Sequence, residues 1–574
     1  MLITAILSDN PFEPPPTGPF VPPPVTHFAL QPKLPPGPSP CSTDIGAPSK
    51  KLPTPINVEC LQRDLTGYDP ILKTQIIKGF NNGFDLGFRG HANNRTNIAN
   101  LKSAIQHPEV VDKNISKELK AGRIAGPFKM IPFDKFQLNP IGVVPKKTPG
   151  SFRMITNLSS PQGNSINDNI SDIFSKVNYA SFSEAIKMII DAGPNAFLAK
   201  TDIEHAFRLI PINPNQYHLL CFKWNNSYYF DRCLPMGARS SCQIFELLSS
   251  AIQFILLKQG LNHCTHYLDD FLIANSSLSK CQTDLDTLLS TCTQLNIPIA
   301  NDKTVAPTQV IQYLGIEIDT IRKTVKLPNE KLDKCKTEIR SLLERKKCSL
   351  RELQSLLGLL QFACRVIVPG RTFLQNLYGL TMGCSKPYHK IRLSKNTKKD
   401  LLIWLKFLEH FNGVSLYKEQ LFLDPSVIQI FTDASKSLGA GAVFGNSWFS
   451  VAWPSKWWPE QNITFLEFIP IVLALETWGQ KLRNSCVQLQ TDNIALVFII
   501  NKQSSKEMLV KALLRRLMLT ALRFNILLQA THIPGYKNYL SDSLSRLQIT
   551  KFFTLHPTAH KSPSHIEPLP LKMS

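Results

Sequence analysis

Apolar and polar positions along the chain follow two periods, which predict strands and helices. Within residues 266–274, two apolar runs flank Asp269 and Asp270, and this pattern predicts a β-hairpin with both carboxylates at its tip. A second predicted strand, residues 197–203, carries Asp202 near its end. Neighbouring carboxylates repel each other, so the arrangement is costly unless a cation lies beside them. Three carboxylates from two strands can hold two divalent ions about 3.5–4 Å apart; a solvated turn is the alternative for an isolated Asp-Asp pair.

Basic residues occupy the turn of another predicted hairpin. Residues 141–145 and 152–157 are both typical of strands, and the Pro-Gly pair between them favours a turn. Lys146 and Lys147 lie in this turn, and Arg153 follows it. Such a hairpin can place ammonium charges and a guanidinium fork on phosphate oxygens. Without further context, the same pattern fits an ordinary solvated turn.

Longer periodic stretches predict helices between and after these strands. The predicted helices cover residues 109–120, 242–257, 278–295, 330–345 and 349–365. Ser349 and Glu352 form a capping box at the start of the last of these. Pro and Gly in residues 234–241 precede the second helix and predict a turn that brings backbone close to a ligand.

A second group of acids appears in the last third of the chain. Strands are predicted at residues 427–433, 439–443, 487–492 and 525–530, with a helix at 464–480. Asp433 and Asp492 end strands, Glu467 lies in the helix, and Asp542 follows the last strand. If these four acids converge, they form a second two-metal site suited to activating water against a phosphodiester. Alternatively, Glu467 belongs to a capping box and Asp492 caps the next helix.

Composition favours a polyanionic partner. The 574 residues include 64 Lys and Arg against 43 Asp and Glu, a net charge of +21; a merely soluble basic protein is the alternative. The 13 cysteines form no Cys-x-x-Cys pair, which favours reduced, packed thiols of an intracellular protein. We expect neither a signal peptide nor a membrane span. Residues 1–56 are proline-rich and predict an extended, solvated arm that serves as a passive leader or as a ligand for a protein partner.

These motifs resemble those of known polymerases and nucleases. Tyr267, one variable residue, Asp269 and Asp270 resemble the signature of the reverse transcriptase palm, and residues 202–208 resemble the family's first catalytic motif. The four later acids resemble, in order and spacing, the acidic quartet of ribonuclease H. The resemblance covers residues 57 to about 550 and is closest to DIRS-like and gypsy-like retrotransposon polymerases, particularly in His532-Ile533-Pro534-Gly535 and Asp542-Ser543-Leu544-Ser545-Arg546.

The resemblance implies an α+β fold. A right-hand polymerase with fingers, palm and thumb would be followed by an α/β ribonuclease H-like domain with a mixed sheet. The expected segments are a disordered arm at 1–56, fingers and palm at 57–325, thumb and connector at 326–425, the ribonuclease H-like domain at 426–550 and a disordered tail at 551–574.

The resemblance also implies roles for single residues. In the polymerase site, Asp202, Asp269 and Asp270 would be catalytic and ligate metal, with help from the carbonyl of Ile203. The nucleotide-binding residues would be Lys146, Lys147, Arg153, Phe207, Met236 and Gly237. Phe207 would act as an aromatic gate beneath the sugar, although packing in the core is its alternative. Many retroviral relatives carry Gln in place of Met236, so backbone contact with the nucleotide is expected there rather than side-chain contact.

The second site would use Asp433, Glu467, Asp492 and Asp542 as both catalytic residues and metal ligands. Each of the two sites would hold two Mg²⁺ ions, which Mn²⁺ can replace. Many ribonucleases H carry a His-bearing loop before the last acid, but here that loop is short, and His532 is expected to pack at the strand end.

The expected function is RNA-directed DNA polymerisation from dNTPs, coupled to hydrolysis of the RNA strand of RNA–DNA hybrids. The expected partners are an RNA template, a DNA primer, the hybrid and dNTPs, without a membrane, in the cytoplasm or the nucleus. Two alternatives are a non-catalytic nucleic-acid-binding protein derived from a retroelement and an RNA-dependent RNA polymerase. Phe207 and the ribonuclease H signature disfavour the RNA polymerase.

Overall fold

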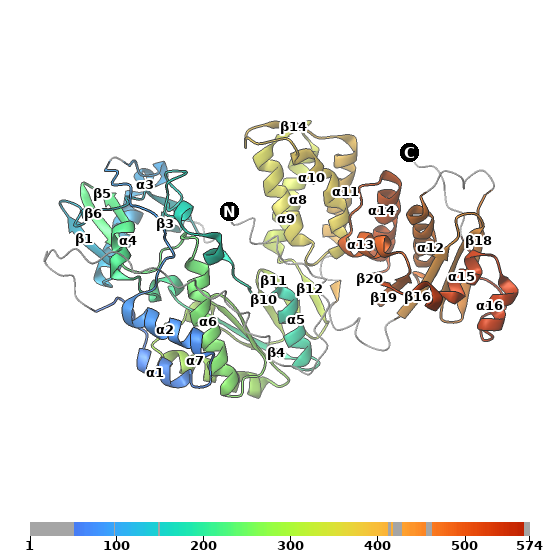
Figure 1. The fold of residues 1–574 in the computed structure, drawn as a ribbon, viewed down its shortest axis with the longest axis horizontal. Helices are drawn as coiled ribbons and strands as arrows, with labels where there is room; N and C mark the ends of the chain where they lie inside the picture. Colours follow the sequence, from blue (N-terminus) through green and yellow to red (C-terminus); the bar gives the residue numbers. More distant parts are fainter. Residues whose placement is uncertain are drawn as a thin grey trace. The chain divides into compact units, whose positions relative to one another are not determined.

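The computed structural model describes residues 51–96, 98–146, 150–410, 415–416, 428–454 and 462–566. These residues fall into two compact units, one that ends at Thr308 and one that begins at Gln309 (Figure 1). Both units mix helices and sheets, as the predicted α+β class requires. Residues 1–50 of the predicted arm lie outside the described residues.

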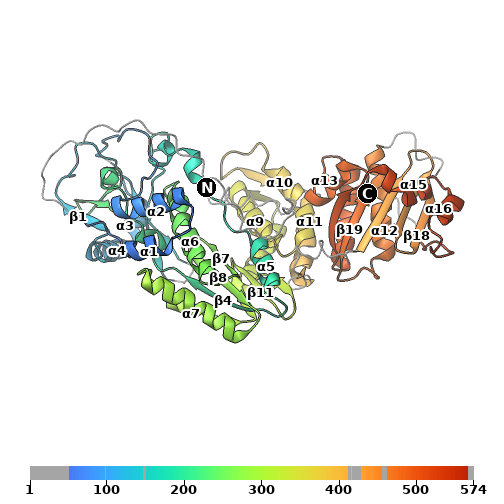
Figure 2. The same cartoon turned by 60° about the horizontal axis from the view of Figure 1, so that its bottom comes forward.

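A four-stranded antiparallel sheet with the order β7-β8-β4-β9 forms the centre of the first unit. Its strands are β4 (Phe197–Asp202), β7 (Cys264–Tyr267), β8 (Asp270–Asn275) and β9 (Val305–Thr308). Helices α5 (Phe182–Asp191), α6 (Ser241–Lys258) and α7 (Leu278–Gln294) pack on it, and Figure 2 shows α6 and α7 beside these strands. The predicted strands and helices of this region are confirmed.

Helix α6 combines length with an apolar composition. Among the described residues it is the one helix long and apolar enough to cross a membrane by those two criteria. Ten of its residues, Phe245 and Leu248 among them, are buried in the core of the first unit, which is how the core helix of a folded domain behaves.

The remaining elements of the first unit lie before and between the strands of the central sheet. The helices are α1 (Val58–Asp64), α2 (Pro70–Asn82), α3 (Lys102–Gln106) and α4 (Pro108–Lys120), and the short helices are η1 (Asn167–Asn169), η2 (Asp172–Ser175), η3 (Ala206–Leu209), η4 (Pro214–Leu219) and η5 (Asn301–Lys303). Strands β1 (Ile124–Phe128), β5 (Cys221–Trp224) and β6 (Ser227–Asp231) form one sheet, and β2 (Ile141–Pro145) and β3 (Phe152–Thr156) form the predicted hairpin.

The second unit begins with a small antiparallel sheet followed by helices. The strands are β10 (Val310–Tyr313), β11 (Ile316–Asp319), β12 (Thr324–Lys326), β13 (Lys347–Ser349), β14 (Lys390–Arg392) and β15 (Ser415–Leu416), and the helices are α8 (Asn329–Leu343), α9 (Leu350–Ala363), η6 (Val368–Leu374), α10 (Gln375–Thr381) and α11 (Lys395–His410). The capping box at α9 is confirmed, because Glu352 N donates to Ser349 Oγ at 3.3 Å and Ser349 N donates to Glu352 Oε2 at 2.7 Å.

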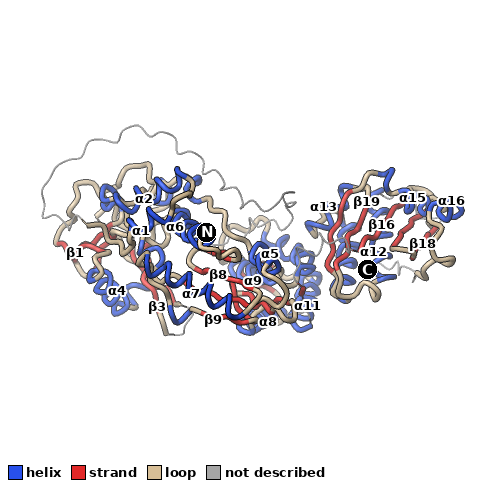
Figure 3. The backbone as a smooth tube through the Cα atoms, turned by 90° about the horizontal axis from the view of Figure 1, so that it is seen from below, coloured by secondary structure: helices blue, strands red, loops and turns tan. Residues whose placement is uncertain are grey.

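Residues 428–566, here called the C-terminal domain, contain a five-stranded mixed sheet (Figure 3). The order is β18-β17-β16-β19-β20, with β19 parallel to both of its neighbours and the other pairs antiparallel. The strands are β16 (Ile428–Ala434), β17 (Gly439–Phe444), β18 (Ser447–Ala452), β19 (Cys486–Thr491) and β20 (Leu527–His532). The helices are α12 (Ile463–Trp478), α13 (Ile494–Lys502), α14 (Met508–Arg523), η7 (Gly535–Lys537), α15 (Tyr539–Ser545) and α16 (Ile549–Leu555).

A glycine allows α15 to approach the sheet closely. A Cβ atom at Gly441 of β17 would lie 2.3 Å from the Cβ of Leu544, so any larger residue would push α15 away. Because α15 carries Asp542, this close packing helps to fix one of the predicted catalytic acids.

The predicted disordered tail is wrong for residues 551–566. Phe552 of α16 is fully buried and its ring centroid lies 5.2 Å from that of Trp448. Further along, Trp448 Nε1 donates to the carbonyl of His560 at 2.7 Å, and Trp478 Nε1 donates to Ser564 Oγ at 3.0 Å. The segment is ordered because two indoles of the sheet domain need apolar contacts and hydrogen-bond partners, which a reading of the tail alone does not show.

We predict that Phe552→Ala lowers the free energy of unfolding by about 3–5 kcal/mol, because it leaves a cavity beside Trp448. Leu555→Ala, in the same helix but at an exposed position, should cost no more than about 0.5 kcal/mol. Urea denaturation followed by tryptophan fluorescence measures both. Equal effects of the two substitutions would show that α16 does not complete the core.

Candidate active sites

The first acidic cluster lies at one end of the central sheet of the first unit. Asp202 ends β4 and pairs in register with Asp270, which begins β8. Asp269 lies in the turn between β7 and β8, and its carbonyl accepts a hydrogen bond from Ile203 N at 2.9 Å. The turn requires a positive φ of 54° at Leu268. The predicted hairpin therefore places three carboxyl groups from two neighbouring strands together.

Burial and mutual repulsion make these carboxylates unstable as anions. Burial raises the pKa of Asp270 to about 6. The pKa of Asp269 is also raised, first by burial and then by the negative charge of Asp202. Groups that hold protons for this reason gain from a cation in the same place, so a divalent metal would offset the repulsion among these carboxylates.

Lys303 of η5 supplies a positive charge to this cluster. Its Nζ lies 2.7 Å from Asp202 Oδ1, and this hydrogen bond raises the pKa of Lys303 although burial opposes it. Within the described ranges, no three His, Cys, Asp or Glu side chains stand close enough to form a complete cation site. Sequence reasoning missed Lys303, which lies 101 residues after its partner.

A buried polar network links the hairpin of β7 and β8 to helix α6. Both ring nitrogens of His266 face acceptors: Nδ1 lies 2.6 Å from Gln253 Oε1 and Nε2 lies 2.9 Å from Glu246 Oε1. Gln253 and Glu246 belong to α6, and Gln253 Nε2 donates to the carbonyl of Cys264 at 2.8 Å. His266 is buried, so these contacts fix the strand that leads into the two aspartates.

The predicted nucleotide-binding residues approach the same cluster. Arg153 Nη1 lies 3.6 Å from Met236 Sδ, and the charge of Arg153 acts to lower the pKa of Asp269. Lys146 is exposed at the end of β2, and its backbone N donates to the carbonyl of Ser151 at 2.8 Å. Lys147 lies outside the described residues.

Gly237 adopts a φ of +110°, which favours glycine, and its carbonyl accepts from Asn167 Nδ2 at 2.9 Å. The same amide accepts from Arg239 N at 2.8 Å, so Asn167 holds the loop before α6 on both sides. Asn167 was not among the sequence candidates. It lies 70 residues before Gly237, and no local pattern links the two positions.

Phe207 lies on η3, close in sequence to Asp202. Its ring is half-buried, and the centroid lies 5.3 Å from that of Phe245 in α6. The contact shows packing on one side of the ring, while the partial exposure leaves part of the ring accessible. Its assignment as a sugar gate stays a prediction.

The second acidic cluster lies in the C-terminal domain. Asp433 is on β16, Glu467 on α12, Asp492 directly after β19 and Asp542 on α15. Capping does not explain two of these acids, because the cap of α12 is Asn462 and the cap of α13 is Asn493. Their positions are therefore available for chemistry.

The second cluster is also costly in its charged form. Burial raises the pKa of Asp433 to about 6, and the charges of Asp492 and Asp542 add to the effect. Burial raises the pKa of Glu467 to about 7, with the charges of Asp492 and Asp433 adding to it. Glu467 Oε2 is a buried oxygen without a hydrogen-bond partner. An orphaned buried oxygen beside other carboxylates fits a cation ligand.

The loop before Asp542 borders this cluster. A Cβ atom at Gly535 would lie 3.4 Å from Asp492 Oδ2, and Arg546 Nε donates to Asp542 Oδ1 at 2.8 Å. His532 is exposed at the end of β20, where its backbone pairs with Thr491. The structure thus places His532 at the strand end, but the predicted packing of its side chain is wrong, because the residue is exposed there.

Comparison with known proteins identifies the class of the first unit. Residues 144–318 match the family model described as reverse transcriptase (RNA-dependent DNA polymerase). This match begins near the end of β2 and includes the turn and second strand of the basic hairpin, all three acids of the first cluster, β10 and most of β11. The chain therefore contains a reverse transcriptase domain.

The homologues of this domain include viral and transposon polyproteins. The chain is 25% identical over 202 residues to the Pro-Pol polyprotein of feline foamy virus, which covers 35% of this chain and 16% of that protein. It is 23% identical over 385 residues to the retrovirus-related Pol polyprotein from transposon 297 of Drosophila melanogaster. This alignment covers 64% of this chain and 33% of that protein. It is 23% identical over 244 residues to Protein P of heron hepatitis B virus, and this alignment covers 42% of this chain and 29% of that protein. The chain thus spans a third or less of the length of these relatives.

Among solved structures, a foamy viral protease-reverse transcriptase in complex with double-stranded DNA is similar to the chain with a TM-score of 0.48 and 16% identity. The match covers 87% of this chain and 84% of that one. A foamy viral protease-reverse transcriptase in complex with an RNA/DNA hybrid has a TM-score of 0.46 at 16% identity. The match covers 83% of this chain and 63% of that one.

We predict that Glu467→Gln stabilises α12 at pH 8 in the absence of divalent metal, by about 1 kcal/mol after allowance for solvent screening. The pKa of Glu467 is raised on folding, so its protonated form stabilises the fold, and this stability is lost as the pH rises toward 7. The advantage of the variant should therefore shrink between pH 8 and pH 5. Hydrogen exchange of α12 amides measures the difference.

Adding Mg²⁺ at pH 8 should reverse the order, because the cation stabilises the wild-type carboxylate more than the amide. Glu476→Gln is the matched control, since Glu476 lies on the same helix but pairs with Arg516. A wild-type α12 that Mg²⁺ leaves unprotected would contradict the metal assignment.

Proposed function

We propose that the chain is the RNA-directed DNA polymerase of a DIRS-like or gypsy-like retroelement, fused to a ribonuclease H. The observation that carries the proposal is the in-register pair of Asp202 and Asp270, with Asp269 at the intervening turn, inside a reverse transcriptase domain. The match to the reverse transcriptase family supports the RNA-directed activity, and the described residues that we assign to it belong to the first unit.

The acidic residues would hold the metal ions. Asp202, Asp269 and Asp270, with the carbonyl of Ile203, would bind two Mg²⁺ or Mn²⁺ ions, and the acids of the C-terminal domain would bind two more. When bound, such ions act as Lewis acids that lower the pKa of a bound hydroxyl or water and neutralise charge on phosphoryl oxygens. The raised pKa values of Asp270, Asp433 and Glu467 support this assignment.

In the polymerase site, the chain's own residues position the substrates. Arg153, Lys146 and Lys147 would contact the triphosphate of a dNTP, because guanidinium and ammonium groups bind phosphate oxygens. The primer 3′-hydroxyl would attack the α-phosphate, and pyrophosphate would leave. The backbone around Met236 and Gly237, held by Asn167, would lie against the nucleotide and template.

Phe207 would select the sugar. A ring beneath the ribose clashes with a 2′-hydroxyl and leaves room for a 2′-hydrogen, so deoxynucleotides are accepted. The intermediate burial of Phe207 beside the buried Phe245 supports this role, since the residue is packed against the core without being fully enclosed.

In the second site, Asp433, Glu467, Asp492 and Asp542 would orient water against a phosphodiester of the RNA strand. The substrate would be an RNA–DNA hybrid, recognised by its groove shape and 2′-hydroxyl groups. The net charge of +21 supports binding of nucleic acid in general. The partners of the chain are an RNA template, a DNA primer and dNTPs, and the reaction takes place in the cytoplasm or the nucleus.

We predict that the full chain extends a DNA primer on an RNA template in the presence of Mg²⁺ and dNTPs. Asp269→Asn should lower the rate at least about a hundredfold, because it removes several kcal/mol of transition-state stabilisation. Labelled dNTP incorporation measures the rate. The same variant should still release labelled RNA fragments from a preformed hybrid.

Asp433→Asn serves as the reciprocal control. It should abolish RNA release and leave primer extension within about twofold of wild type, because Asp433 belongs to the other compact unit and, among the described residues, shares no contact partner with the three acids of the polymerase site. If folded wild-type protein binds the hybrid but extends no primer, the chain is a non-catalytic nucleic-acid-binding protein. If it prefers ribonucleotides, it is an RNA polymerase.

A further inference from the structure

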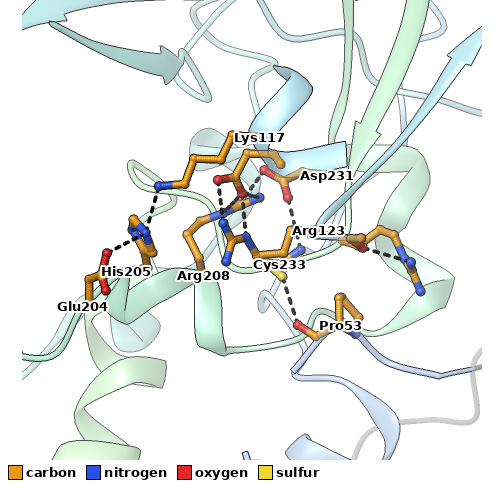
Figure 4. Close-up of polar contacts among 11 residues, drawn as sticks. Pro53, Lys117, Arg123, Glu204, His205, Arg208, Asp231 and Cys233 are labelled. Atoms are coloured by element: carbon orange, nitrogen blue, oxygen red, sulfur yellow. Dashed lines mark hydrogen bonds and ion pairs between the residues drawn. The ribbon is translucent and has the colours of Figure 1, made fainter. Parts of the chain in front are cut away.

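Arg208 lies next to Phe207 on the single turn of η3 and connects that turn to distant elements (Figure 4). Its Nη1 donates to Asp231 Oδ2 of β6 at 2.7 Å. Its Nε donates to Glu118 Oε2 of α4 at 3.0 Å, and its Nη2 lies 2.9 Å from the same oxygen. One side chain therefore connects three elements of the first unit.

Arg123 completes the network from the other side. Its guanidinium forms two hydrogen bonds with Glu118, from Nε to Oε2 and from Nη2 to Oε1, each 2.8 Å long. The side chains of Arg208, Glu118 and Asp231 are 13%, 9% and 14% exposed. Burial alone would raise the pKa of Glu118, but the two guanidinium groups hold it below its usual range. The network is charge-balanced and largely shielded from water.

The start of η3 has a second link to α4. His205, which precedes η3, has a φ of +57°, and its Nε2 lies 3.0 Å from Lys117 Nζ and 3.0 Å from Glu204 Oε1 (Figure 4). The side chain of Lys117 in α4 thus lies within hydrogen-bond distance of the residue that precedes η3. Two adjacent residues of α4, Lys117 and Glu118, thus contact the residues on either side of the turn's Phe207, namely His205 and Arg208.

We propose that Arg208 is a positioning residue for sugar discrimination. By tying η3 to α4 and β6, it fixes the ring of Phe207 and so sets how strongly the polymerase site prefers deoxynucleotides over ribonucleotides. The inference rests on the proposed polymerase function and on the contact of Phe207 with the sugar. A gate that works by steric clash needs such support, because displacements well below 1 Å decide whether a 2′-hydroxyl fits.

The chemistry of this position favours arginine. A guanidinium fork can satisfy two carboxylates at once, whereas the lysine ammonium is a point charge on a flexible stem. Arg208→Lys therefore keeps the charge and loosens the geometry. We expect the ratio of kcat/KM for a dNTP to that for the matching rNTP to fall about tenfold, within the range that such pockets achieve.

Arg123→Lys is the matched control. It weakens the same network at the same carboxylate, but Arg123 is not on η3. The control should leave the dNTP/rNTP ratio within about twofold of wild type, even if it lowers thermal stability as much as Arg208→Lys does. Equal falls of the ratio in both variants would overturn the inference, since they would mark a general loss of structure.

Coupling to Phe207 gives the decisive readout. Phe207→Val should lower the ratio by itself, and adding Arg208→Lys should change it no further, because Arg208 acts through the ring. Additive effects would overturn the inference. If Arg208→Lys does not fold, Asp231→Asn, which keeps the shape and an acceptor, should lower the ratio in the same direction. A wild-type protein that incorporates no dNTP would instead refute the proposed function.

Discussion

Repulsion between buried carboxylates is the constraint on which both candidate sites depend. In the first unit, Asp269 and Asp270 cannot ionise freely beside Asp202, and burial raises the pKa of Asp270 to about 6. Folding alone does not favour such a cluster, because each carboxylate loses hydration and gains a like charge. The surrounding structure must therefore hold these residues in place, and in the proposed function a cation would offset their charge.

Buried polar networks support both the hairpin and η3, the short helix that follows Asp202. His266 contacts two acceptors on α6, and Arg208 joins Glu118 to Asp231. Buried ion pairs contribute little net stability, since desolvation offsets most of their attraction. Their directional contacts instead define a single geometry. An apolar core with interchangeable rotamers defines its geometry less sharply. We infer that this region gives up stability for a fixed arrangement of charged groups.

The local elements could be predicted from the sequence, but their long-range partners could not. Strand alternation around Asp269 and the capping box at Ser349 depend on neighbours within a few residues, and both predictions are confirmed. Lys303 and Asn167 have partners 101 and 70 residues away, so no local pattern marks them. The sequence did not predict that the segment around Phe552 is ordered, for the same reason: its partner Trp448 lies on β18, far away in the sequence.

The two clusters offset their repulsion in different ways, and this difference follows from their surroundings. Lys303 brings a full positive charge onto Asp202, so part of the charge in the first cluster is balanced within the chain. In the second cluster Arg546 balances Asp542, but the charges acting on Glu467 are those of Asp492 and Asp433, which add to burial and raise its pKa to about 7. A proton therefore competes with a cation for Glu467 near neutral pH, while at Asp202 the competitor is an ammonium group on a flexible stem. Acidification should thus weaken cation binding in the C-terminal domain as Glu467 takes up a proton, and in the polymerase site as Asp270, whose pKa burial also raises, does the same.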